Sequence, residues 1–332
     1  MTARAEMFAA GGGEVLVLDD DRRLSRRLRR HGIAGTPAAR AAFREIVTGT
    51  SAIEHHRIGV QVVAEDLPLL LPASGLLVGA RVDRGAQPLF GRRGESVTRE
   101  REDLGTVLAA MTAAGAAFAS WRAIFVVGDR GGARMPSASV IETNAGTMAR
   151  FAGRCVDMGL VPVLVVEVLP DGDHDLGRGA AATAEILGAL FGALTTHGVS
   201  AGEVVLTTTP AREGVGSRVR ATSCEVAEAT STAMADVPAA VGAVSYLCGP
   251  EPFGRFAEDL SAVRRRSASS IVGFTVGRAL TDAVLSAWRG DPARTACARR
   301  VLEERLARLD RADVLAHRQR ARHSRTSACL PG

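Results

Sequence analysis

The chain contains no lysine, so any chemistry in it must be done by other side chains. All 41 of the Lys+Arg residues among its 332 residues are arginine, although lysine is ordinarily among the commonest residues of soluble proteins. A carbonyl substrate therefore finds no side-chain amine with which to form a Schiff base. Two carboxylates, Asp19 in VLVLD and Glu167 in VLVVEVL, lie at or near the ends of apolar runs typical of buried strands. We expect these two carboxylates to transfer protons.

The missing lysines have two explanations, and the sequence favours neither. A composition rich in Ala, Gly and Arg is typical of a GC-rich genome, in which lysine codons drift toward arginine codons. The alternative is selection against reactive amines, as expected if a substrate or product is an aldehyde or a dicarbonyl compound.

The cysteines and histidines do not form a metal-binding pattern. None of the cysteines belongs to a C-x-x-C pair, and no histidine is spaced for zinc. We therefore expect reduced thiols, no metal and no cofactor. The five cysteines are Cys155, Cys224, Cys248, Cys297 and Cys329.

Charge and hydropathy exclude several classes of partner. The formal charge is +5 and the pI is near 9.4, but aromatic residues make up only 4% and acidic residues are interspersed. This pattern predicts an ordinary basic surface rather than a nucleic-acid interface. The longest apolar run, Leu160 to Leu169, falls well short of the roughly 20 residues that span a bilayer. We expect a cytoplasmic protein that binds neither nucleic acid nor membranes.

Short β-branched runs alternate with Ala-, Arg- and Glu-rich stretches of helical period, which is typical of parallel β-α units. Eight such units in one chain predict an α/β fold, a single-domain (β/α)₈ TIM barrel. An open doubly wound sheet is the alternative, but no G-x-G-x-x-G follows the first run. The eight runs are Glu14 to Leu18, Ile58 to Ala64, Leu76 to Val82, Trp121 to Val127, Val161 to Leu169, Glu203 to Thr208, Val241 to Leu247 and Ser270 to Thr275.

The predicted helices surround these strands and set the domain limits. The barrel is expected over 13–317, including a C-terminal helix from Pro292 to His317, with an N-terminal extension over 1–12 and a basic tail over 318–332. The other clear helices are predicted over Arg22 to Arg30, Arg99 to Ala114, Ala180 to Thr196 and Phe256 to Arg265.

Several strings in the chain resemble the class I fructose-bisphosphate aldolases of the animal and plant type. They are RVDRGAQPLFGRRGE from Arg81, GAAFASWR from Gly115, PSASVIETNAGTMARFA from Pro136, GLVPVLVVEVLPDGDHDL from Gly159 and GFTVGRALTDAVLSAWRGDP from Gly273. They follow the order and spacing of that family from about Gly13 to Arg308, almost without gaps.

The resemblance implies that the catalytic centre of the family has been altered here. The nucleophilic lysine of the sixth strand aligns with Leu206, and a lysine of the fourth strand aligns with Ser120, which we expect in the catalytic centre. A lysine of the third strand becomes Arg81. Of two glutamates on the fifth strand, the first becomes Val165 and the second is retained as Glu167. Leu206 and Val165 are expected to line the pocket; removal of neighbouring charges for stability alone is the alternative.

Other family positions are retained, and the resemblance assigns most of them to anion binding. Phosphate is held in the family by backbone N–H groups and a guanidinium, so we expect the substrate anion at Arg81, Arg122, Cys248, Gly249, Gly277 and Arg278. For the three arginines the alternative is ion pairing with Asp83, Glu167 or Glu142, and for Asp19 and Glu167 it is neutralisation of arginines. Cys248, which replaces a serine, is either a nucleophile or a silent substitution.

These features predict an aldolase-like lyase of small-molecule biosynthesis. It would act on a small anionic carbonyl compound, with a phosphate or carboxylate group, by non-covalent acid/base chemistry: aldol-type C–C bond formation or cleavage, isomerisation or cyclisation. The alternative is an inactive pseudo-aldolase that senses a ligand or binds a partner protein. The resemblance also implies a homo-oligomer. The C-terminal tyrosine of the family is missing, since Tyr246, the only tyrosine, lies in the seventh predicted strand.

Overall fold

Eight parallel strands close into a barrel, as the sequence predicts. The computed structural model describes residues 6, 8, 10–70, 75–130, 133–267 and 272–310. Around the barrel the strands follow the order β1-β12-β11-β10-β9-β6-β3-β2, with β2 pairing back onto β1. Their bounds are β1 Val15–Val17, β2 Gly59–Val63, β3 Leu77–Arg81, β6 Phe118–Val126, β9 Val161–Leu169, β10 Val205–Thr208, β11 Ala243–Leu247 and β12 Val272–Val276.

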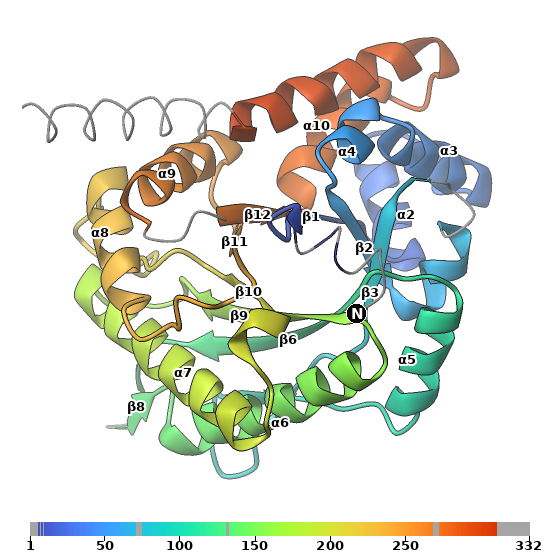
Figure 1. Ribbon diagram of the computed structural model, residues 1–332. Helices are drawn as coiled ribbons and strands as arrows, with labels where there is room; N and C mark the ends of the chain where they lie inside the picture. Colours follow the sequence, from blue (N-terminus) through green and yellow to red (C-terminus); the bar gives the residue numbers. More distant parts are fainter. Residues whose placement is uncertain are drawn as a thin grey trace, which may run out of the picture.

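Helices form an outer ring around the strands, in chain order (Figure 1). The α-helices are α2 Asp21–Arg30, α3 Pro37–Thr48, α4 Ser51–His55, α5 Leu104–Ala113, α6 Ala138–Asp157, α7 Leu176–Thr196, α8 Ser223–Ala233, α9 Phe253–Arg266 and α10 Arg278–Trp288. Short 3₁₀ turns occupy Ala64–Leu69, Ala201–Glu203 and Pro292–Arg294, and residues 295–310 are helical. Two antiparallel hairpins pair β4 (Ala86–Pro88) with β5 (Ser96–Thr98) and β7 (Gly128–Arg130) with β8 (Ala133–Met135). The predicted basic tail over 318–332 and the end of the predicted last helix lie outside the described residues.

Alternation along the strands produces two separate hydrophobic layers. Leu164, Leu206 and Tyr246 belong to the large layer between the strands and the helices. Their chain neighbours on the same strands face the barrel interior instead, because successive strand side chains point to opposite faces. The interior layer consists of Phe8, Val15, Leu77, Ala117, Phe118, Val161, Val163, Val165, Val205 and Ala243.

Part of the predicted N-terminal extension closes the bottom of the barrel. Phe8 is fully buried and stacks on Phe118, with ring centroids 4.3 Å apart. The space for these rings comes from Gly59, where a Cβ would lie 2.6 Å from Phe8 Cε2. Because Gly59 and Phe118 begin their strands, the plug fills the end opposite the strand C-termini.

Helix α7 is long and apolar enough by composition to cross a membrane, but it is a helix of the barrel's outer layer. It has 21 residues, and half of its most apolar window is buried inside the protein. Its buried side chains, among them Ile186, Leu190 and Leu194, belong to the layer beneath the helices. Asp175 caps its start by accepting a hydrogen bond from Arg178 N at 2.7 Å.

Gly79 provides a test of the tight packing at the barrel bottom. A Cβ at Gly79 would clash with the carbonyl oxygen and the ring of Phe118, so Gly79→Ala should lower the free energy of unfolding by about 1–3 kcal/mol. The control is Gly188→Ala on α7, where a Cβ meets nothing within 4 Å and a gain of up to about 1 kcal/mol is expected. Denaturant unfolding followed by circular dichroism measures both. Equal stabilities for the two variants would refute the close approach of β3 and β6.

Candidate active site

The predicted site residues gather at one end of the barrel. Parallel strands bring their C-terminal ends to the same rim, which is where barrel active sites lie. Asp19 follows β1, Arg81 ends β3 and Glu167 lies near the end of β9. Gly249 follows β11 and Gly277 follows β12. These five residues therefore lie at the rim formed by the C-terminal ends of the strands.

Glu167 and Arg122 form an ion pair on neighbouring strands. Both Nε and Nη2 of Arg122 contact the same carboxylate oxygen, Oε2 of Glu167. The other oxygen, Oε1, has no hydrogen-bond partner among the described residues, and the side chain is 12% exposed. Val165, two residues earlier on β9, belongs to the interior layer below Glu167. The arrangement gives a fixed carboxylate with one oxygen left to accept a proton.

Arg81 and Ser120 lie side by side, because the register pairs them across β3 and β6. Ser120 is 1% exposed, and its neighbours Ala119 and Trp121 face the helices, so its hydroxyl faces the interior. Neither Ser120 Oγ nor Arg81 Nε has a hydrogen-bond partner in the described protein. The nearest acid, Asp83, lies 3.8 Å from Arg81 Nε, which is too long for a hydrogen bond. Buried polar atoms without partners are rare, and a polar ligand would satisfy these two.

Asp83 is held by the backbone rather than by Arg81. Its side chain is 2% exposed, and its carboxylate accepts from Gly85 N at 2.9 Å and from Arg122 N at 3.2 Å. The alternative role for the three arginines was ion pairing with Asp83, Glu167 or Glu142. Among these pairs, Arg122 and Glu167 are in direct hydrogen-bonding contact. The third candidate acid, Glu142, is exposed on α6.

Asp19 is tied to an arginine that sequence reasoning missed. Arg27 on α2 donates from Nη1 to Asp19 Oδ2 at 2.6 Å, and it also binds Asp282 and Thr281 of α10. Its side chain is only 9% exposed, although α2 reads as an arginine-rich surface helix. The spacing of Leu24, Arg27 and Leu28 in the sequence could have revealed this burial, because it places Arg27 on the same inward face of the helix as the two leucines.

The expectation that Leu206 lines the pocket is wrong. Leu206 is completely buried in the layer beneath the helices, whereas Val205 belongs to the interior layer. Thr207 faces the interior, since its hydroxyl lies 3.5 Å from that of Thr275 on β12, a strand that is not adjacent to β10. Thr275 in turn shares a 2.8 Å hydrogen bond with Ser245 on β11. A shift of one residue along a strand moves a side chain to the other face, so the interior position on β10 is Thr207.

Cys248 is not an activated nucleophile. Burial raises the pKa of its thiol to about 12, and the nearby Glu251 carboxylate adds to the rise while Arg212 opposes it. Burial therefore favours the neutral thiol over the thiolate near pH 7. Gly249, expected to offer its N–H to an anion, instead donates to Glu251 Oε1 at 3.2 Å.

Gly277 and Arg278 are further residues that were expected to bind the substrate anion. Gly277 precedes the first residue of α10, and Arg278 is that first residue. Its side chain is exposed, and no ion pair joins Arg278 to any residue in the described ranges. The positive end of an 11-residue helix adds to the charge of the guanidinium.

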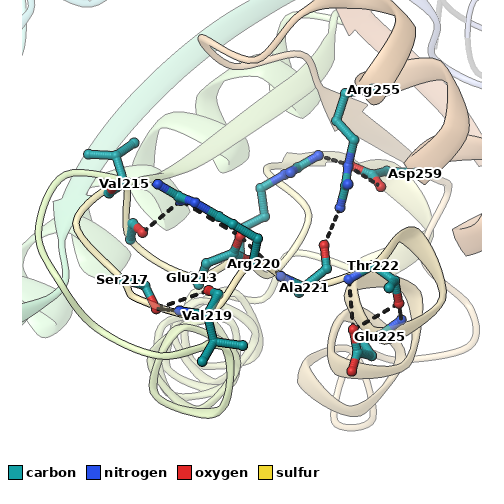
Figure 2. Close-up of polar contacts among 12 residues, drawn as sticks. Glu213, Val215, Ser217, Val219, Arg220, Ala221, Thr222, Glu225, Arg255 and Asp259 are labelled. Atoms are coloured by element: carbon teal, nitrogen blue, oxygen red, sulfur yellow. Dashed lines mark hydrogen bonds and ion pairs between the residues drawn. The ribbon is translucent and has the colours of Figure 1, made fainter.

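Beside this rim, the segment between β10 and α8 is fixed by ion pairs and caps. Figure 2 shows Arg255 between Asp259 and the carbonyl oxygen of Ala221, to which Arg255 Nη2 donates at 2.6 Å. Asp259 is fully buried and also pairs with Arg212. In the same view Thr222 and Glu225 form the capping box that starts α8. These contacts attach the segment to α9, so it is not a free loop.

Thiol labelling tests the state of Cys248. At pH 7–8, iodoacetamide should modify the exposed Cys224 well before Cys248 or the fully buried Cys155, whose pKa burial also raises. Peptide mass spectrometry measures the modified fraction of each cysteine. Preferential labelling of Cys248 in the folded protein would restore the nucleophile hypothesis.

Truncation of Leu206 tests the assignment of strand faces on β10. Leu206→Ala opens a cavity beneath the helices and should lower the free energy of unfolding by about 2–5 kcal/mol. Leu69→Ala is the control, because Leu69 is 59% exposed and the change should cost less than about 0.5 kcal/mol. If Leu206→Ala lowered the free energy of unfolding as little as the control does, Leu206 would line an open pocket instead of packing beneath the helices.

Comparison with known proteins agrees with the fold. The family model for class I fructose-bisphosphate aldolase matches residues 1–329. Rat fructose-bisphosphate aldolase C is 33% identical over 298 residues, which cover 85% of this chain and 81% of the rat protein. A probable class 1 fructose-bisphosphate aldolase from Xanthomonas campestris is 32% identical, with 87% and 89% covered. The lamprey non-muscle aldolase is 36% identical, with 72% of this chain and 65% of that protein covered.

A solved structure is similar over nearly the whole chain. Fructose-bisphosphate aldolase from Plasmodium falciparum, crystallised in complex with TRAP and a small-molecule inhibitor, superposes with a TM-score of 0.85. The match covers 94% of this chain and 95% of that one, at 26% identity. The chain belongs to the class I fructose-bisphosphate aldolase family.

Proposed function

We propose that this protein is an aldolase-like lyase that acts on a small anionic carbonyl compound by non-covalent acid/base chemistry. The observation that carries the proposal is the free carboxylate oxygen of Glu167 at the barrel mouth. Arg122 holds Oε2 of Glu167 and leaves Oε1 open. A base fixed in this way can remove a proton next to a carbonyl group. Because the carboxylate is already in position, no free energy is needed to reorient it during the reaction.

The carbonyl oxygen would be bound by hydrogen bonds in place of an iminium. Ser120 Oγ and Arg81 Nε are buried, adjacent and unpartnered within the described residues. Both can donate to the negative charge that develops on the oxygen when a neighbouring C–H or C–C bond breaks. Thr207 occupies the interior position of β10, and a hydroxyl at that position forms no Schiff base.

The anionic group of the substrate would lie at the start of α10. Arg278 is exposed, no ion pair joins it to an acid in the described ranges, and Gly277 directly precedes it at the start of α10. Arg81, which ends β3, adds another positive charge at the same rim of the barrel. A phosphate or a carboxylate fits such a position equally well.

Asp19 is the second proton-transfer candidate. Its carboxylate is held by Arg27, which is itself held by α10. Through Arg27, Asp19 at the end of β1 is therefore linked to α10, where the substrate anion is expected. The proposed role of Asp19 is to position α10 as well as to transfer protons. We also propose that the protein is cytoplasmic and works in small-molecule biosynthesis and, from family resemblance, that it forms a homo-oligomer.

The second candidate function is a pseudo-aldolase scaffold for ligand sensing or partner binding. The observation that favours it is that Glu167 and Asp19 each have an arginine as counter-ion. In a scaffold these carboxylates only neutralise charge, and their chemistry is not used.

Proton exchange separates the two candidates. Loss of α-proton signal in D₂O is followed by NMR for dihydroxyacetone phosphate and for a panel of phosphorylated and carboxylated hydroxyketones and hydroxyaldehydes. The wild-type chain should exchange at least one of them, and Glu167→Gln should slow this exchange by about 100-fold or more. The matched control is Glu142→Gln on the exposed face of α6, which should exchange at the wild-type rate.

Two results would contradict the proposal. Exchange at the buffer rate with every compound favours the scaffold. Exchange that survives Glu167→Gln, in a variant whose circular dichroism spectrum is unchanged, assigns the base to another residue.

A further inference from the structure

Gln61 is a polar residue directly above the apolar bottom of the barrel interior. It lies on β2 between Val60 and Val62, which belong to the layer beneath the helices. Gly59, two residues earlier, faces Phe8 of the interior layer. Since side chains two residues apart on a strand share a face, Gln61 points into the barrel. It is nearer than Gly59 to the C-terminal ends of the strands, where the barrel opens.

The side-chain amide of Gln61 is nearly buried but has no partner within the described residues. Gln61 is 7% exposed, and no hydrogen bond joins its amide to another residue in those ranges. Glutamine is mostly found at protein surfaces, and a buried amide without a partner is costly. The amide atoms of Gln61 are not sealed off, in contrast to Ser120 Oγ and Arg81 Nε. A ligand in the barrel mouth can therefore reach this amide.

Gln61 lies between two residues of the proposed catalytic centre. Its register partners are Val17 on β1 and Gly79 on β3. Two residues further along the chain from these partners come Asp19 and Arg81. The amide is thus placed deeper in the barrel than the proton-transfer candidate Asp19 and the proposed carbonyl-binding Arg81.

An amide at this position suits a hydroxyl group better than a charged group. The amide has N–H donors and a carbonyl acceptor but no net charge, and a hydroxyl group can both donate to it and accept from it. An anionic group would instead favour the guanidinium of Arg81. If a substrate analogue lacked the hydroxyl group, the amide would remain buried and unpaired, so the analogue would bind more weakly.

We propose that Gln61 is a specificity-determining residue that binds a hydroxyl group of the substrate at the floor of the barrel mouth. Gln61 thereby selects hydroxylated compounds over analogues that lack this hydroxyl group. The inference rests on the proposed function for the anionic end of the substrate. Its tests use compounds without a ketone or aldehyde group, so they do not depend on proton exchange.

Selective ¹⁵N labelling of glutamine tests the contact directly. The chain has three glutamines, Gln61, Gln87 and Gln319, and Gln61→Met should remove the NMR signals of one side-chain NH₂ group, which assigns that group to Gln61. We expect glycerol 3-phosphate or erythritol 4-phosphate to shift these signals. Gln87 on the exposed strand β4 is the internal control, and its signals should stay in place. Unshifted Gln61 signals at saturation with both compounds would overturn the proposal.

Isothermal titration calorimetry measures the selectivity. Glycerol 3-phosphate, erythritol 4-phosphate and glucitol 6-phosphate are compared with propyl, butyl and hexyl phosphate, and glycerate is compared with propionate. The wild-type chain should bind at least one hydroxylated compound about tenfold more tightly than its counterpart. Gln61→Met should bring this ratio close to one, whereas the matched control Gln87→Met should keep the wild-type ratio.

Denaturant unfolding separates a binding role from a structural one. Methionine has nearly the volume of glutamine and needs no hydrogen-bond partner, so the unfolding midpoint of Gln61→Met should be no lower than that of the wild type. A marked fall in this midpoint would show that the amide stabilises the fold and would contradict the proposal.

The binding results can overturn the proposal in three ways. A ratio near one in the wild type would mean that the amide contacts only water. A ratio retained in Gln61→Met would assign the hydroxyl group to another residue. If none of the compounds bound, the anion position at α10 would be wrong and the inference would fall with it. Hydroxyl preference in a chain without proton exchange would reject only the catalytic function, and exchange without this preference would reject only the role of Gln61.

Discussion

The pleat of the parallel strands is the constraint on which the site depends. Each strand sends alternate side chains to the interior and to the helices, and barrel closure leaves no strand free to slip. Ser120, Glu167 and Thr207 face the interior for this reason, while Leu206 does not. Because all eight strands are parallel, every interior side chain near the C-terminal end of a strand lies at the same rim of the barrel.

The absence of lysine changes what this rim can do but does not remove its chemistry. An amine activates a ketone by forming an iminium, which a hydroxyl or a guanidinium cannot do. Hydrogen-bond donors can still stabilise negative charge on the carbonyl oxygen, with larger effect in a buried site than in water. Ser120 and Arg81 provide such donors, and Arg122, two residues after Ser120 on β6, holds the Glu167 carboxylate. The proposed reaction therefore keeps proton transfer and replaces covalent activation with electrostatic stabilisation.

The sequence predicted the strands well and the side-chain environment less well. Apolar runs bounded by polar residues located all eight strands; the fourth starts at Phe118, three residues earlier than predicted. The string VVLTTT on β10 has no polar alternation, so it could not show which residue faces inward, and Leu206 was assigned to the wrong face. Arg27 and Glu251 act through contacts that form only when the chain folds. Phe8 reads as part of a short extension, and only its stacking on Phe118 shows that it belongs to the core.

The most direct measurement of the central claim is ¹³C NMR of dihydroxyacetone phosphate labelled at its carbonyl carbon and bound to the protein. Non-covalent catalysis predicts that the bound signal remains that of a ketone or its hydrate, displaced only by hydrogen bonding. A signal at the position of an iminium or a carbinolamine would show a covalent bond to nitrogen and would contradict the mechanism.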